Sequence, residues 1–152
     1  RKGKAMIPTH FTEISIRYHR TEETKIQMHS AQEVYHAVKY LFDDTMFYKE
    51  TVYALFVDNA GKALSVIKIG EGGLSECFVN KKAIGQAALL QNAAGVFIIH
   101  NHPSGVTRPS QNDIAITNVI SNMLRELTDT KLIDHLVICH DNFTSMKDEG
   151  LI

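Results

Sequence analysis

Apolar residues recur along the chain with two periodicities, one typical of strands and the other typical of helices. Alternating or continuous β-branched runs predict strands, and apolar positions three and four apart behind a polar cap predict helices. The predicted strands cover residues 11–18, 51–57, 63–69, 95–99, 131–139 and 143–146. The predicted helices cover residues 30–43 and 80–91 and a third segment that opens at Ser110. This close alternation predicts an α/β or α+β fold with a layered sheet.

Local signals mark where several of these elements begin and end. Ser30 and Glu33 have the spacing of a capping box, and Asn80 is a typical helix cap. Turn residues at 58–62 join two strands into a hairpin, and the glycine-rich stretch 70–73 is expected to end it. Within the second helix, the residues expected to face inward are Ile84, Ala87, Ala88, Leu89 and Leu90.

Length and composition indicate one globular domain. At 152 residues the chain can bury a sizeable core, and its 44% hydrophobic and 22% charged residues are ordinary for a water-soluble protein. We expect residues 1–29 to form an N-terminal lead-in with a possible edge strand, and residues 30–152 to form the domain itself.

Charge, cysteine content and hydropathy limit the partners and the compartment. A formal net charge of −1 does not favour binding to nucleic acid, although a local basic patch would be compatible with it. Cys77 and Cys139 are too few and too far apart to predict a disulfide framework. No apolar run reaches the roughly 18 residues of a membrane span. We therefore expect a reduced, cytoplasmic protein without membrane contact.

The segment that follows the strand at 95–99 contains the residues with the clearest chemistry. His100 and His102 are two residues apart, so on a strand their side chains lie on one face, roughly 7 Å apart at the backbone. Ser110 is placed to cap the following helix, with Asp113 one turn in. Two imidazoles and one carboxylate are the usual ligands of catalytic zinc, which keeps a fourth position for water. The sequence thus predicts a Zn²⁺ site formed by His100, His102 and Asp113, suited to hydrolysis.

The spacing of these residues resembles a known family pattern. His100-x-His102, then seven residues, then Ser110-x-x-Asp113 is similar to the JAMM (MPN-type) metallopeptidase motif. The fuller string at 100–105, His-Asn-His-Pro-Ser-Gly, resembles the RadC-like branch of that superfamily, and the resemblance extends from about residue 50 to the end of the chain. It implies a cytidine-deaminase-like (JAB/MPN) fold, in which a central mixed sheet is flanked by helices.

The resemblance also implies two catalytic roles. A general base is needed to take a proton from water, and the candidates are Glu50, Glu71 and Glu76. We favour Glu50, which stands at the head of an apolar strand where the resembling family carries its glutamate. Ser110 matches the serine that stabilises the oxyanion in JAMM enzymes, although a helix cap explains it equally well.

The expected function is a zinc-dependent hydrolase that cleaves an amide bond in a peptide or protein substrate, as a peptidase or isopeptidase. The alternatives are an accessory module associated with DNA repair and a metal-binding scaffold without catalysis. His135 also resembles a family position, but a histidine on a strand is more often a satisfied core residue than a ligand. The sequence leaves the substrate and the oligomeric state open.

Overall fold

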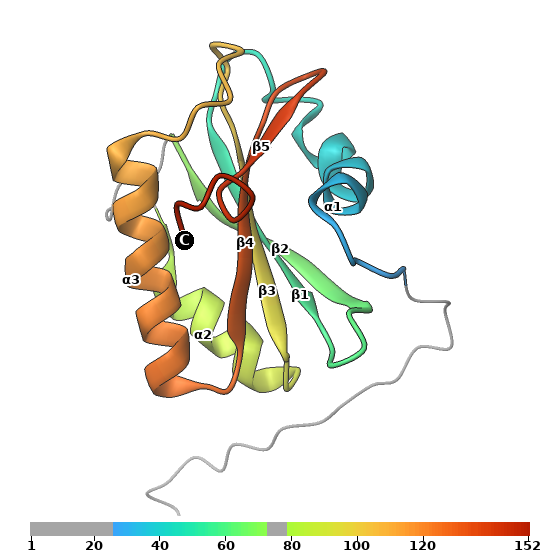
Figure 1. Ribbon diagram of the computed structural model, residues 1–152, viewed down its shortest axis with the longest axis vertical. Helices are drawn as coiled ribbons and strands as arrows, with labels where there is room; N and C mark the ends of the chain where they lie inside the picture. The colour runs from blue at the N-terminus through green and yellow to red at the C-terminus, as the bar shows by residue number, and fades with distance from the viewer. Residues whose placement is uncertain (1–25, 73–78) are drawn as a thin grey trace, which may run out of the picture.

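The computed structural model describes residues 26–72 and 79–152 and contains one five-stranded mixed sheet (Figure 1). The strands are β1 (Thr51–Val57), β2 (Ala63–Glu71), β3 (Gly95–Asn101), β4 (Lys131–Ile138) and β5 (Phe143–Ser145). Their order across the sheet is β2-β1-β3-β4-β5, and only β3 and β4 pair in parallel. The helices are α1 (Ala31–Val38), the 3₁₀ helix η1 (Lys39–Phe42), α2 (Lys81–Leu90) and α3 (Gln111–Leu127). The predicted α/β fold with a central mixed sheet is confirmed.

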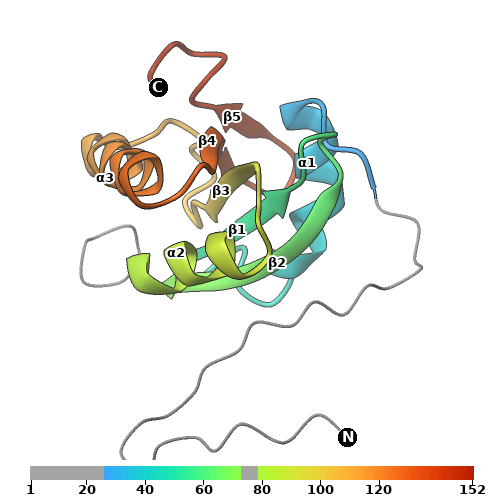
Figure 2. The ribbon, with the colours of Figure 1, turned by 90° about the horizontal axis from the view of Figure 1, so that it is seen from below.

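Helices cover both faces of the sheet (Figure 2), with α1 on one side and α2 and α3 on the other. Because successive strand residues point to opposite faces, each strand contributes to two cores. Val96 and Ile98 of β3 pack with the α2 and α3 side, whereas Phe97 and Ile99 pack with the α1 side. This explains why β3 is buried along its whole length and has a continuous apolar sequence rather than an alternating one.

Most predicted element boundaries agree with the structure to within two residues. The capping box of Ser30 and Glu33 is present, and Asn80 caps α2 through its side chain. Three details differ. The helix predicted at 30–43 tightens into a 3₁₀ turn after Val38, β2 continues to Glu71 before the chain turns, and β3 continues through His100 and Asn101.

Two further predictions concern a strand near the N-terminus and the orientation of the leucines in α2. The strand predicted at 11–18 lies outside the described residues. Residues Met28 and Gln27 already associate with the domain, through burial in the α1-side core and a bridge to Lys62. Leu89 and Leu90 were expected to face inward, and this is wrong: both are more than half exposed, because at helical spacing they lie off the face that carries the buried Ile84 and Ala88.

Candidate metal centre

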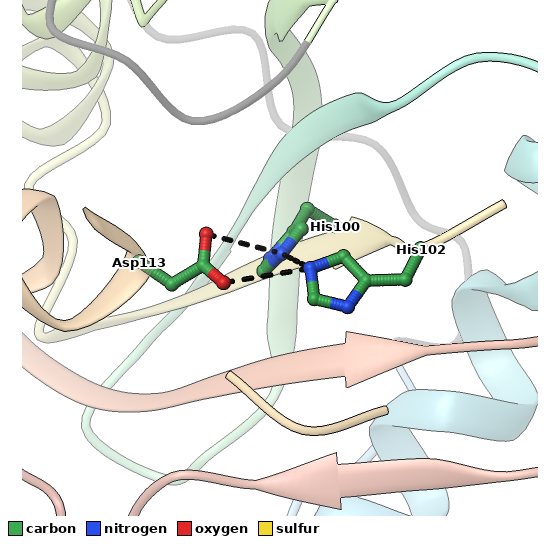
Figure 3. A group of neighbouring side chains, drawn as sticks. All are labelled: His100, His102 and Asp113. Carbon is green, nitrogen blue, oxygen red and sulfur yellow. Dashed lines mark hydrogen bonds and ion pairs between the residues drawn. The ribbon is translucent and has the colours of Figure 1, made fainter. Parts of the chain in front are cut away.

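His100, His102 and Asp113 come together where β3 ends and α3 begins (Figure 3). His100 is the next-to-last residue of β3, His102 directly follows the strand, and Asp113 lies in the first turn of α3. One potential ligand atom from each residue lies within 4.8 Å of the others. Among the described residues these three form the group that could hold a metal ion.

The distances within the group fit a tetrahedral ion. The two histidine Nε2 atoms are 2.9 Å apart, and Asp113 places Oδ1 3.4 Å from His100 Nε2 and Oδ2 3.4 Å from His102 Nε2. In a tetrahedral Zn²⁺ site, ligand atoms about 2.0–2.2 Å from the ion lie about 3.3 Å from one another. The three distances between the histidine nitrogens and the carboxylate oxygens are close to that value. His100 and Asp113 are buried, whereas His102 is partly exposed, which leaves one side of the group open.

Hydrogen bonding fixes which nitrogen of His102 faces the group. Its Nδ1 lies 2.7 Å from the carbonyl oxygen of Val106. A carbonyl can only accept, so Nδ1 carries the hydrogen and donates it, and in the neutral ring Nε2 keeps its lone pair. A nitrogen lone pair directed at two further ligand atoms is the arrangement that binds a cation.

The electrostatics of the group favour the protonation states that metal binding needs at Asp113 and His100, whereas at His102 a proton competes with the metal. Burial works to raise the pKa of Asp113, but the neighbouring imidazoles of His100 and His102 and the backbone N–H of Ser110 outweigh it and hold that pKa well below its usual value. Burial lowers the pKa of His100 despite the attraction of Asp113. The hydrogen bond with Asp113 raises the pKa of the more exposed His102. The aspartate is therefore a carboxylate, and the buried histidine is neutral.

Ser110 and Asp113 form the capping box that the sequence predicts. Ser110 Oγ accepts a hydrogen bond from Asp113 N at 3.0 Å, and Asp113 Oδ2 accepts one from Ser110 N at 2.6 Å. The cap that starts α3 thus also fixes the aspartate carboxylate, which points at the two imidazoles. Ser110 itself is exposed beside the group.

Glu50 precedes β1 and is partly buried. Val52 pairs with His100 in the antiparallel β1–β3 ladder, and Thr51, which follows Glu50, donates hydrogen bonds to the side chain of Asn101, which precedes His102. The negative charge of Glu50 favours the protonated form of both histidines, although burial still lowers the pKa of His100 overall. Its charge therefore acts on the group, while its role as a base stays a prediction.

The other two candidate bases are placed differently. Glu71 forms ion pairs with Lys49 and Lys68, so its carboxylate is already engaged by two ammonium groups. Glu76 lies outside the described residues. The preference for Glu50 over Glu71 is consistent with these contacts.

Two further residues contact this region in ways that the sequence analysis missed. His135, expected to be a satisfied core histidine, is fully buried and hydrogen-bonded, but one partner is His100 Nδ1 at 2.8 Å. Burial lowers the pKa of His135 well below its usual value. Asn101, between the two histidines, points to the opposite face and bonds Thr51 and Lys49, on either side of Glu50. Only the parallel pairing of β3 with β4 could have indicated the contact between His135 and His100.

The fold and the site together define a JAB/MPN-type domain. Residues 28–151 match the family model described as the RadC-like JAB domain. The match therefore begins closer to the N-terminus than the resemblance seen from about residue 50. The chain belongs to the RadC-like JAB domain family.

Several relatives are UPF0758 proteins from bacteria. One from Flavobacterium johnsoniae is 35% identical over 102 residues, which covers 67% of this chain and 44% of the relative. One from Geobacter sulfurreducens is 33% identical over 126 residues, with 81% and 52% covered. One from Photobacterium profundum is 33% identical over 121 residues, with 80% and 53% covered. The chain spans about half the length of the curated relatives it matches.

None of the helices formed by residues 26–72 and 79–152 combines the length and the apolar character needed to cross a membrane.

Proposed function

We propose that this domain is a zinc-dependent hydrolase that cleaves an amide bond in a peptide or protein, as a peptidase or isopeptidase. The observation that carries the proposal is the group His100, His102 and Asp113, whose ligand atoms converge at tetrahedral spacing beside a solvent-accessible face. Membership of the JAB family supports a hydrolytic role for this group.

Zinc held by these residues would act as a Lewis acid and lower the pKa of water towards about 7. Glu50, whose charge already acts on both histidines, accepts the proton of the attacking water and delivers it to the leaving nitrogen. Ser110 accepts a hydrogen bond from Asp113 N, so its own hydroxyl hydrogen can be donated to the developing oxyanion.

The test pairs metal analysis with a cleavage assay. The purified protein is analysed for bound metals, then incubated with a peptide library, with and without chelator, and the products are identified by mass spectrometry. We expect zinc at one equivalent and cleavage that stops on chelation and returns with Zn²⁺. Zinc binding without any cleavage would support the scaffold alternative and contradict the proposal.

The role of Glu50 is tested by Glu50→Gln, which keeps the size of the side chain and removes the proton acceptor. We expect zinc content to be unchanged and turnover to fall about 10²–10⁴-fold. Glu71→Gln is the matched control, because Glu71 is the nearby glutamate engaged by two lysines. Full activity of Glu50→Gln, or an equal loss in both variants, would remove Glu50 from the mechanism.

A further inference from the structure

His135 lies behind His100 and is connected through it to the candidate metal centre. It pairs with Ile98 in the parallel β3–β4 ladder, and its side chain is fully buried on the side of the sheet that α3 covers. Its Nε2 is 2.8 Å from His100 Nδ1, and its Nδ1 is 2.6 Å from Thr117 Oγ1. Both ring nitrogens are therefore engaged.

Thr117 continues this chain of contacts into the backbone of α3. Its hydroxyl oxygen lies 2.5 Å from the carbonyl oxygen of Asp113, four residues earlier in the helix. The chain thus runs from His100 through His135 and Thr117 back to Asp113. It begins at one member of the metal group and ends on the backbone of another.

The backbone carbonyl sets the direction of these hydrogen bonds. It can only accept, so the Thr117 hydroxyl donates to Asp113 O, and its oxygen accepts the hydrogen on His135 Nδ1. A fully buried imidazole with uncharged partners is neutral and carries one N–H, so His135 Nε2 is an acceptor. His100 must then donate from Nδ1.

The opposite direction is unfavourable. If Thr117 donated to His135, its hydroxyl oxygen and the carbonyl oxygen of Asp113 would face each other at 2.5 Å with no hydrogen between them. The favoured order leaves His100 Nε2 without a hydrogen and able to accept, 2.9 Å from His102 Nε2 and 3.4 Å from Asp113 Oδ1.

We propose that His135, oriented by Thr117, is a positioning residue that holds His100 in the tautomer whose Nε2 can bind a divalent transition metal. A histidine partner serves this purpose differently from the usual carboxylate or carbonyl, because it accepts at Nε2 only while Thr117 keeps the hydrogen on its Nδ1. The inference rests on the metal site of the proposed function but not on hydrolysis.

Thr117→Val removes the hydroxyl and keeps the shape of the side chain. His135 can then carry its hydrogen on Nε2, which turns the hydrogen of His100 towards the metal position. We expect zinc affinity, measured by competition with a chromophoric chelator, to fall about 10–100-fold, as for the loss of other outer partners of metal ligands. Thr117→Ser keeps the hydroxyl and should retain affinity near that of the wild type.

Thr128→Val is the matched control. Thr128 is the threonine at the end of the same helix, and its Oγ1 bonds the carbonyl of Leu124, four residues earlier, at 2.7 Å without touching a histidine. We expect its zinc affinity to equal that of the wild type. Wild-type affinity in Thr117→Val, or an equal loss in Thr117→Ser and Thr117→Val, would overturn the proposal.

A spectroscopic readout tests the same inference without a variant. Long-range ¹H–¹⁵N correlation spectra of the metal-free wild type should show His100 protonated at Nδ1 and unprotonated at Nε2, and His135 likewise. A hydrogen on His100 Nε2 would overturn the proposal even if Thr117→Val failed to fold. Zinc binding without cleavage would contradict the proposed function alone, whereas absence of zinc binding would overturn both.

Discussion

Replacing Asn101 with leucine should destabilise the domain strongly, although neither residue carries charge. The Asn101 side chain is fully buried on the α1 side of β3. Its Oδ1 accepts hydrogen bonds from Thr51 N at 2.8 Å and Thr51 Oγ1 at 3.0 Å. Its Nδ2 donates to Lys49 O at 2.9 Å and lies 3.3 Å from the carbonyl oxygens of Thr45 and Met46. One side chain thus ties the loop before β1 to the strand that carries the histidines.

The magnitude follows from the two shortest of these bonds. Leucine has a similar shape but no polar atom, so Thr51 N loses its partner in a fully buried place, at a cost of roughly 1–3 kcal/mol. The Lys49 carbonyl is only partly buried, so water can replace part of its bond, and its loss adds about 1 kcal/mol. The expected total of about 2–4 kcal/mol is a large share of the 5–15 kcal/mol typical of a whole domain.

Urea unfolding followed by circular dichroism measures this loss as a shift of the midpoint at unchanged slope. Asn122→Leu is the control, because Asn122 is exposed on α3 and its Oδ1 accepts a hydrogen bond from Arg125 at the surface. That change should stay within about 0.5 kcal/mol. A loss below about 1 kcal/mol for Asn101→Leu, or equal losses in the two variants, would refute the role assigned to Asn101.

Two further predictions concern Ser110 and Cys139. Ser110→Ala and Ser30→Ala each remove an exposed serine hydroxyl from a capping box and should each cost about 0.5–2 kcal/mol in urea unfolding. Only Ser110→Ala should also lower turnover, by about 10²–10³-fold. Equal turnover in the two variants would leave Ser110 as a cap alone. Burial raises the pKa of the Cys139 thiol, so in a Cys77→Ser background its alkylation should reach half-maximal rate at a higher pH in the folded protein than in the urea-unfolded chain. Coinciding pH midpoints would contradict the effect of burial.

The elements that the sequence predicted well depend on local signals. Ser30, Asn80 and Ser110 each precede their helix at the expected spacing, and their caps involve residues three positions away. The strands β1 and β3 were recognised because they are buried on both faces and therefore have nearly continuous apolar sequences. The exposed leucines at the end of α2 were misassigned because they are apolar, although their helical positions lie off the face of Ile84 and Ala88.

The partners of the site residues were less predictable because they lie far apart in the sequence. His135 contacts His100 through the pairing of β3 with β4, and Thr117 contacts His135 because α3 packs on β4. Asn101 bonds the first residue of β1 and the loop before it, about 50 residues earlier in the sequence. Neither composition nor spacing encodes such contacts, which appear only once the sheet order is known.

Asp113 shows why a short motif nevertheless indicated the candidate metal site. Its Oδ2 accepts a hydrogen bond from Ser110 N in the capping box of α3. Asp113 therefore cannot turn its carboxylate away without losing its half of that capping box. The helix start lies beside the end of β3, and the two histidines occupy the end of that strand. Local folding chemistry therefore directs the carboxylate, and the loop between His102 and Ser110 only has to be the right length. Because Glu50 comes from the segment before β1 and has no such local constraint, its position depends on Asn101, which bonds Lys49 and Thr51 on either side of it, and on the β1–β3 register.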